Sequence, residues 1–325
     1  MFRIDAHLHF MGDHPEAVEL LREMDLKLFN IVVAHGGDDW WQRQAGLYQT
    51  MTRRWPDRYA WCTAFDLEGW GTPDFAERAV AGLERDFADG GALACKVWKN
   101  VGMEFRDADG SFVHLDDERF DPVLNWLADN GKPLLTHIGE PLACWRPLEP
   151  GKPHYNYYSR NPEWHMHGRD DMPSHEEIIA RRDRMLERHP RLRVIGAHLG
   201  SLEYDVAEVA RRFERYPNFA VDISARLDDL AYQDSDTVRQ FFLDFPDRTL
   251  FGTDQVRVEP QSSMTDERRR ATLEETRAEF ELHFRYFESA GPMEVRGRET
   301  TGLCLPADVL DRFYVENARA WYPGL

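Results

Sequence analysis

Polar side chains that could bind a metal ion stand at the ends of several apolar runs in this sequence. They are His7, His9, Lys96, His137, His198 and Asp254. Within residues 4–10, one residue separates His7 from His9, so a β-strand would place both imidazoles on the same face. Imidazole nitrogens combined with a carboxylate oxygen suit a zinc ion. Spacing alone is weak support, because His165 and His167 repeat it inside an irregular segment.

The elements that must position these residues follow a regular order. Eight apolar runs have the length of strands: 2–5, 28–34, 59–65, 92–97, 133–136, 193–197, 219–223 and 249–252. Segments with helical spacing lie between them, including 16–24, 75–87, 121–130, 176–187, 204–213 and 237–245. Strand followed by helix, repeated eight times, predicts an α/β fold of the (β/α)8 TIM-barrel type.

Two parts of the chain depart from this repeat. Residues 140–173, after the fifth strand, are rich in Pro, Tyr, Trp and His and are too long for an ordinary strand-to-helix loop, which suggests a functional insertion. Beyond the eighth strand, residues 266–290 and 306–322 predict a C-terminal helical extension that covers the outside of the barrel. No linker divides the sequence, so we expect one domain over residues 1–325.

The barrel gives the scattered polar residues a common location. His137 follows the fifth strand, His198 the sixth and Asp254 the eighth, and all of these ends meet at one mouth of a parallel barrel. One histidine after a strand is more often structural than functional. Two histidines at equivalent ends of neighbouring strands, with His7 and His9 on the first, favour a shared metal site.

Taken in order, five motifs resemble those of the amidohydrolase superfamily, in particular its family 2, the aminocarboxymuconate semialdehyde decarboxylase-like proteins. The motifs are Asp5-Ala6-His7-Leu8-His9, Thr136-His137, Gly196-Ala197-His198-Leu199-Gly200, Gly252-Thr253-Asp254 and Glu316-Asn317-Ala318. They span nearly the whole chain. Their joint spacing is specific for the family but says little about a substrate.

The resemblance implies roles for the polar residues. His7, His9 and His137 would bind a divalent metal ion, zinc in the first instance, with Asp254 as a further ligand or as the proton acceptor from metal-activated water. His198 would be a catalytic acid or base. Lys96 leaves two alternatives open: if carbamylated it would bridge a second ion, and otherwise it would face an anionic substrate group. We favour one ion over two.

Further residues are candidates for substrate contact by position alone. Lys96 and Arg226, which follow the fourth and seventh strands, could hold an anionic group, although Arg226 could equally form a structural ion pair. Glu140, Trp145, Tyr158 and Arg160 come from the insertion. For the aromatic residues, simple anchoring of the loop is at least as good an interpretation. Asp222 and Glu140 could instead orient ligands or cap helices.

Composition narrows the class of partner. A formal net charge of -18 disfavours binding to nucleic acids, which are themselves negatively charged. The sequence contains no run of about 20 uncharged apolar residues, the length that a helix needs to span a bilayer. We therefore expect a cytoplasmic protein with a small-molecule substrate and no nucleic-acid or membrane partner. The resemblance also implies that the protein could form a homodimer.

The leading hypothesis is a metal-dependent hydrolase acting on a lactone, ester or amide of a small carboxylated or carbohydrate-like compound. The alternatives are a non-oxidative decarboxylase of an aromatic or muconate-type acid, and a non-catalytic metal-binding protein.

Overall fold

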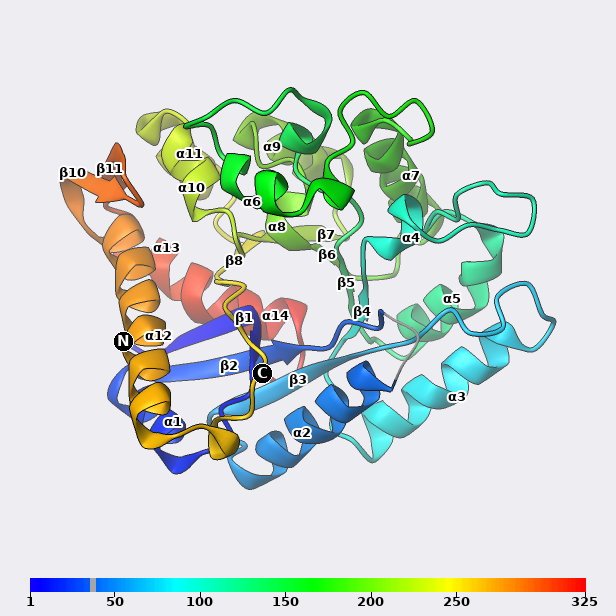
Figure 1. Ribbon diagram of the computed structural model, residues 1–325, viewed down its shortest axis with the longest axis horizontal. Helices are drawn as coiled ribbons and strands as arrows, with labels where there is room; N and C mark the ends of the chain where they lie inside the picture. The colour runs from blue at the N-terminus through cyan, green and yellow to red at the C-terminus, as the bar shows by residue number, and fades with distance from the viewer. Residues whose placement is uncertain (36–38) are drawn as a thin grey trace.

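Parallel strands form the centre of the protein, as a computed structural model describing residues 1–35 and 39–325 shows (Figure 1). The strands are β1 (Arg3–Phe10), β2 (Leu26–Ile31), β3 (Tyr59–Ala64), β4 (Cys95–Val97), β5 (Leu134–Thr136), β6 (Val194–Gly196), β7 (Phe219–Asp222), β8 (Thr249–Leu250) and β9 (Val256–Arg257). Neighbouring strands follow the order of the chain from β1 to β8, and β9 lies on the free side of β1. Each of the eight predicted runs overlaps one of β1 to β8.

The chain that leaves β8 closes this sheet into a ring. The Ala6 N–H donates to the Phe251 carbonyl at 2.9 Å, and the Asp254 N–H donates to the His7 carbonyl at 2.8 Å. β9 then pairs in parallel with β1, with His9 opposite Val256. Since β1 pairs with β2 on its other side, the predicted α/β barrel is confirmed.

Helices cover the outside of the strands. They include α1 (Pro15–Glu23), α2 (Trp40–Arg54), α3 (Phe75–Ala88), α5 (Asp121–Asp129), α7 (His175–Arg188), α9 (Val206–Arg215), α10 (Leu227–Tyr232), α11 (Ser235–Asp244) and α12 (Asp266–Glu288). α7 shows why they form: the Ser174 hydroxyl caps its first turn by accepting the Glu177 N–H at 3.1 Å. Its buried face carries Ile178 and Met185 towards the strands.

The insertion after β5 is partly helical. It contains α6 (Tyr155–Arg160) and two short 3-10 turns, Leu142–Trp145 and Pro162–Trp164. It lies at the top of the view in Figure 1, on the same side as α7. Another short helix, α4 (Asn100–Met103), follows β4.

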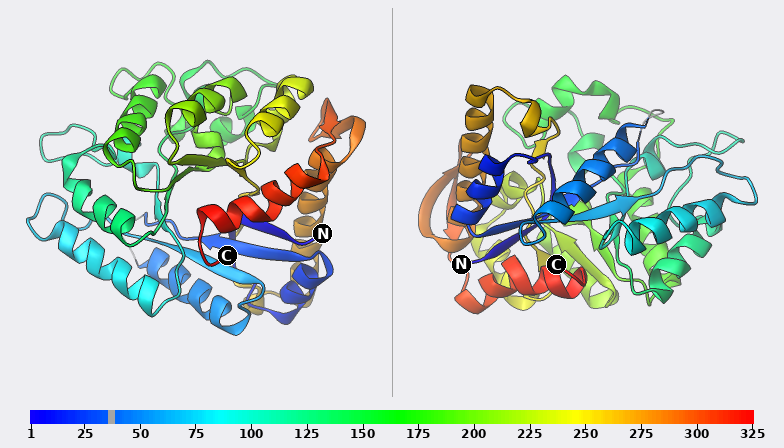
Figure 2. Two further views of the ribbon diagram at one scale, coloured as in Figure 1. Left: turned by 180° about the vertical axis from the view of Figure 1, so that it is seen from behind. Right: turned by 90° about the horizontal axis from the view of Figure 1, so that it is seen from below.

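The last part of the C-terminal extension has a different place from the one predicted, whereas α12 lies on the outside of the strands as expected. α13 (Ala307–Asp311), a π-helical turn (Arg312–Glu316) and α14 (Asn317–Trp321) run as one rod across the strands (Figure 2, red). Ala318, Trp321 and Tyr322 join the core inside the barrel, alongside Ile4 and Leu250. The rod therefore closes the end of the barrel opposite the mouth instead of covering its outer wall.

Between α12 and α13 lies an antiparallel hairpin that was not predicted from the sequence. It is formed by β10 (Ala290–Val295) and β11 (Arg298–Leu303).

Among the described residues, no helix is both long and apolar enough to cross a lipid bilayer.

Candidate metal centre

Three predicted ligands meet at the mouth of the barrel. β1 presents His7 and His9, and Asp254 follows β8; their potential ligand atoms all lie within 4.8 Å of one another. The Asp254 Oδ1 atom is 3.3 Å from His9 Nε2 and 3.8 Å from His7 Nε2. Strand pairing brings these residues together, since Asp254 donates its own N–H to the His7 carbonyl.

The other ring nitrogens of both histidines are already engaged. His9 Nδ1 lies 2.7 Å from the Ile31 carbonyl, and His7 Nδ1 lies 2.8 Å from Asp222 Oδ2. These oxygens can only accept, so each Nδ1 carries the proton and each Nε2 keeps a lone pair. Burial also lowers the pKa of His7, which keeps it neutral. The two nitrogens and one carboxylate oxygen fit a divalent metal ion.

Asp222 organises the layer behind these ligands. Its Oδ1 accepts the backbone N–H of His198 at 2.9 Å and that of Ser224 at 3.1 Å, and it also accepts the Ser224 hydroxyl. Burial would raise the pKa of Asp222, but His7 and His198 outweigh it and hold that pKa below its ordinary value. With both oxygens used, Asp222 orients the histidines, which was one of the two roles considered from sequence.

His198 lies beside His7 at the end of β6. Its ring centre is 5.0 Å from that of His7, and its Nδ1 is 2.8 Å from the Ser224 carbonyl. Nδ1 therefore donates, and Nε2 is the atom that His198 can present to a ligand or substrate. Burial holds the pKa of His198 well below its ordinary value, so the ring is neutral.

His137 is close to this group but separate from the three converging ligands. Its ring centre is 4.3 Å from that of His198, and its Nε2 is buried with no hydrogen-bond partner. A buried nitrogen without a partner is costly unless a ligand occupies it. Its predicted role as a metal ligand is consistent with that orphaned atom, and it stays a prediction.

Lys96 reaches the same space from β4. It is buried, and its Nζ is 3.5 Å from His7 Nε2. Burial lowers the pKa of Lys96 to about 8, against the opposing charges of Asp222 and Asp254. Its alternative roles, bridging a second ion or facing an anion, both require this position.

Lys99 is a residue that the sequence analysis missed. It is buried and forms an ion pair with Glu140, whose other oxygen accepts the Tyr158 hydroxyl at 2.8 Å. Its Nζ also lies 3.6 Å from the centre of the Trp164 ring. Glu140 and Tyr158 were both predicted to contact substrate; Glu140 is instead paired with Lys99, and Tyr158 is hydrogen-bonded to Glu140. A lysine three positions after Lys96, beside Trp98, was the available signal.

The remaining substrate candidates differ in their surroundings. The Trp145 indole N–H donates to the Pro173 carbonyl at 3.0 Å, which anchors the insertion to itself, and Arg160 is exposed at the end of α6. Arg226 is buried after β7, with its Nε 3.9 Å from Asp229 Oδ2. Burial is the main cause that lowers the pKa values of His137 and His198, and the charge of Arg226 adds to the lowering of both.

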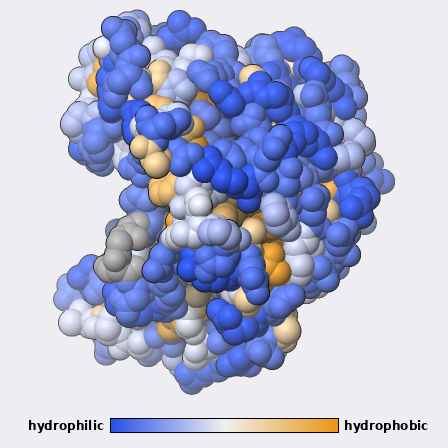
Figure 3. Space-filling view, turned by 90° about the vertical axis from the view of Figure 1, so that its right-hand side faces the viewer, coloured by the Kyte–Doolittle hydropathy of each residue, from blue (hydrophilic) through white to orange (hydrophobic). Residues whose placement is uncertain are grey.

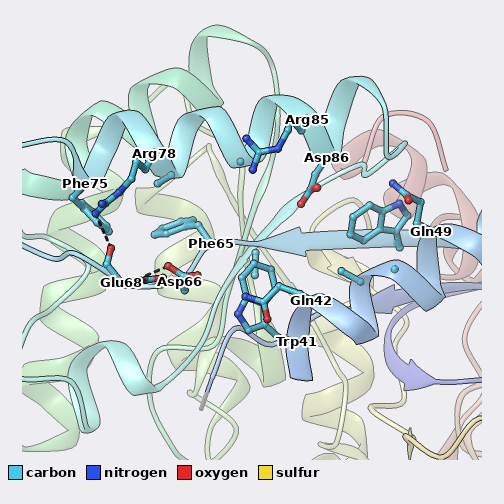
Figure 4. Close-up of a pocket in the computed structure, with 16 residues that line it drawn as sticks. Trp41, Gln42, Gln49, Phe65, Asp66, Glu68, Phe75, Arg78, Arg85 and Asp86 are labelled. Carbon is cyan, nitrogen blue, oxygen red and sulfur yellow. Dashed lines mark hydrogen bonds between the residues drawn. The ribbon is translucent and has the colours of Figure 1, made fainter. Parts of the chain in front are cut away.

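Cavities elsewhere must be distinguished from this centre. One of about 550 Å³ lies between α2 and α3 on the outer side of β3, where the labelled side chains include Trp41, Phe65 and Arg78 (Figure 4). Among its charged groups, Arg78 forms an ion pair with Asp74 at 3.2 Å. The surface also has a deep notch between the part that carries α6 and α7 and the part that carries α2 and α3 (Figure 3).

Comparison with known proteins places the chain in a family. A sequence model described as amidohydrolase matches residues 4–324. No curated protein matches the chain in sequence.

Solved structures of similar fold cover nearly the whole chain at low identity. A TIM-barrel protein from Bordetella bronchiseptica has a TM-score of 0.53 at 16% identity, covering 100% of this chain and 99% of its own. The 4-oxalomesaconate hydratase of Rhodopseudomonas palustris has a TM-score of 0.54 at 12% identity, covering 99% and 96%. An amidohydrolase from Burkholderia multivorans, solved with bound zinc, has a TM-score of 0.51 at 16% identity, covering 99% of both chains. These likenesses support the fold, and the family match over almost the full length confirms the resemblance found in the motifs: the chain belongs to the amidohydrolase family of enzymes.

Proposed function

We propose that this enzyme is a metal-dependent hydrolase that cleaves a lactone, ester or amide bond in a small carboxylated or carbohydrate-like substrate. The observation that carries the proposal is the convergence of His7, His9 and Asp254, with the second nitrogen of each histidine held by an acceptor. A zinc-bound amidohydrolase of the same fold adds support. A single divalent ion bound by these residues would polarise the substrate carbonyl and lower the pKa of water from about 15.7 towards 7.

The protein's own groups then handle the proton. Burial would raise the pKa of Asp254, but the adjacent imidazoles of His9, His198 and His7 outweigh this effect and hold that pKa below its ordinary value, so the carboxylate stays ionised. We assign to Asp254, besides its place among the metal ligands, acceptance of the proton from the attacking water and its transfer to the leaving oxygen or nitrogen, which balances the cleavage. His198 presents a neutral Nε2, which orients that water by accepting a hydrogen bond.

Cationic groups would select the substrate. Arg226 and Lys96 are both buried near the histidines, in a protein whose net charge is -18. Two buried cations at the centre of an acidic protein favour a substrate with an anionic group.

The reaction can be tested by supplying zinc-loaded protein with a panel of lactones and aromatic carboxylic acids while recording proton release and carbon dioxide release. We expect proton release from a lactone, its loss after chelation and its return with Zn²⁺. The His198→Asn variant should keep its metal but lose about 10²-fold in kcat, because the attacking water is no longer oriented. Carbon dioxide from an aromatic acid without net hydrolysis would instead identify a decarboxylase.

The metal site has an internal control. His165 and His167 share the spacing of His7 and His9, but they lie in the insertion, with His165 Nε2 2.9 Å from the Arg146 carbonyl and His167 Nδ1 3.3 Å from the Trp145 carbonyl. Replacing His7 and His9 together by alanine should abolish bound metal, whereas replacing His165 and His167 should leave it stoichiometric. Full metal content in the first variant would refute the site.

A further inference from the structure

A second cavity, separate from the metal centre, lies between the insertion and the segments that follow β6 and β7. Its volume is about 410 Å³, within the range of small-molecule sites. Among its lining residues are Leu142, Leu148, Lys152, His154, Tyr155, Glu203, Tyr204, Asp229, Tyr232 and Gln233. None of the predicted metal ligands lines it.

Two buried carboxylates with unused oxygens line this cavity. Glu203 is 2% exposed and Asp229 is 6% exposed. Glu203 Oε1 accepts the Leu142 N–H at 2.8 Å, and Asp229 Oδ1 lies 2.9 Å from His154 Nε2. The remaining oxygens, Glu203 Oε2 and Asp229 Oδ2, are buried with no hydrogen bond. A buried carboxylate oxygen without a donor is unfavourable, and so a donor is missing at this point.

The adjacent protein cation does not supply that donor. Arg226 is buried beside the two carboxylates, but its Nε is 3.9 Å from Asp229 Oδ2 and is itself without a hydrogen bond. Arg146 and Lys152 also line the cavity, but among the described residues neither forms an ion pair with Glu203 or Asp229. Burial and the charge of Asp229 raise the pKa of Glu203 to about 7.

The walls of the cavity suit an organic cation. Tyr155, Tyr204 and Tyr232 line it, and the face of Tyr232 already attracts positive groups, with Arg298 3.7 Å and Lys152 5.4 Å from the ring centre. Leu142 and Leu148 add apolar surface. An inorganic ion fits less well, because the groups of three clustered metal-ligand atoms among residues 1–35 and 39–325 lie at the histidines and not here.

We propose that this cavity is a binding site for a small organic cation, a primary amine or guanidinium attached to an apolar body. Its N–H groups donate to Glu203 Oε2 and Asp229 Oδ2, and its apolar part packs among the tyrosines. None of the residues that line the cavity takes part in the proposed hydrolase chemistry, and the one link between the two sites is Arg226, which lies against Asp229 and which we also assign to substrate binding.

Calorimetric titration of the metal-loaded enzyme tests the site, with phenethylamine as the probe. Its trimethylated analogue keeps the charge but cannot donate, and 2-phenylethanol keeps the body but lacks the charge. We expect saturable binding of phenethylamine and at least tenfold weaker binding of both analogues.

Variants locate the binding. Glu203→Gln and Asp229→Asn retain the shape of each side chain and the oxygen that already has a partner. Each substitution should weaken the binding of phenethylamine at least tenfold. Glu149→Gln removes an exposed acid at the rim and should leave the affinity within about twofold. Thermal unfolding checks that each variant is folded. No saturable binding to the unmodified enzyme, equal binding of the three compounds, or unchanged affinity in both folded carboxylate variants would overturn the proposal.

Discussion

At the scale of single residues, the site depends on backbone conformations that the sequence pattern does not reveal. His198, Ala225 and Asp254 follow β6, β7 and β8 with φ values of 60°, 55° and 56°. A residue other than glycine in this left-handed region costs about 1–2 kcal/mol, so surrounding contacts must hold it. For His198, the Asp222 carboxylate does so by accepting its N–H.

This explains which parts of the site could be predicted. His7, His9 and Asp254 could be placed together because strand order alone brings their strands to one mouth. Ser224 and Lys99 were missed because their roles depend on side-chain directions after the strands end. Serine and lysine are common at surfaces, so neither residue type distinguished itself in the sequence.

Asp222 is the residue whose loss should affect the metal most without removing a ligand. The Asp222→Asn substitution replaces one of the two carboxylate oxygens by an amide NH₂ group, which cannot accept a hydrogen bond. Either the His7 ring or the backbone N–H of His198 therefore loses its acceptor. We expect a 10- to 100-fold loss of zinc affinity, measured by competition with a chromophoric chelator. Asp170→Asn, at an exposed position of the insertion, serves as the control. Unchanged zinc affinity in Asp222→Asn would contradict the orienting role.

Glu203 should make stability depend on pH. Its folded pKa of about 7 exceeds the ordinary value of 4.5, so the folded state binds more protons than the unfolded state between these values. The contribution of Glu203 to the free energy of unfolding is therefore greatest below about pH 4.5 and declines as the pH rises to about 7. Urea unfolding across this range should show a smaller decline in Glu203→Gln. Parallel curves for the two proteins would show that Glu203 titrates normally.

At the scale of elements, the insertion was predicted by its length and composition, but its attachment to the barrel was not. The contact comes from the ion pair between Lys99, after β4, and Glu140, at the start of the insertion. The ring of Trp164, from a later part of the insertion, packs against the Lys99 ammonium group. The Tyr158 hydroxyl, from α6, donates to Glu140. A long polar and aromatic segment can thus be ordered by a few buried contacts at its base.

Breaking this ion pair from one side should therefore loosen the insertion. Lys99→Met leaves the Glu140 carboxylate buried without its cation, and we expect a loss of about 3–5 kcal/mol in the free energy of unfolding. Limited proteolysis should cut first within residues 140–173. The double variant Lys99→Met/Glu140→Gln should recover part of the loss, because no uncompensated charge remains. If the two single effects simply add in the double variant, the pair is not coupled.

At the scale of the whole molecule, the barrel is open at the mouth and closed at the other end. Helices and strands share one hydrophobic layer outside the barrel, while a smaller core inside it ends on Ala318, Trp321 and Tyr322. Asn317 ties this rod to the barrel by donating to the Thr249 carbonyl at 2.8 Å. The helical pattern of residues 306–322 could be predicted, but not its location, because an amphipathic helix packs equally well on an outer wall or across an open end.

Tyr322 tests this closure through its hydroxyl group. Its ring packs 4.7 Å from that of Phe29 inside the barrel, and its hydroxyl is buried with no hydrogen-bond partner. Tyr322→Phe keeps the packing and removes the unsatisfied group, so we expect the free energy of unfolding to rise by about 1 kcal/mol. Tyr322→Ala should lower the free energy of unfolding by about 3–5 kcal/mol because it leaves a cavity at the end of the core.

The matched control is Tyr48→Phe. The Tyr48 hydroxyl accepts a hydrogen bond from Gln44 at 3.1 Å, so its loss should lower the free energy of unfolding by about 1 kcal/mol. Denaturant unfolding measures all three, and equal losses in the two phenylalanine variants would mean that the Tyr322 hydroxyl has a partner in solution.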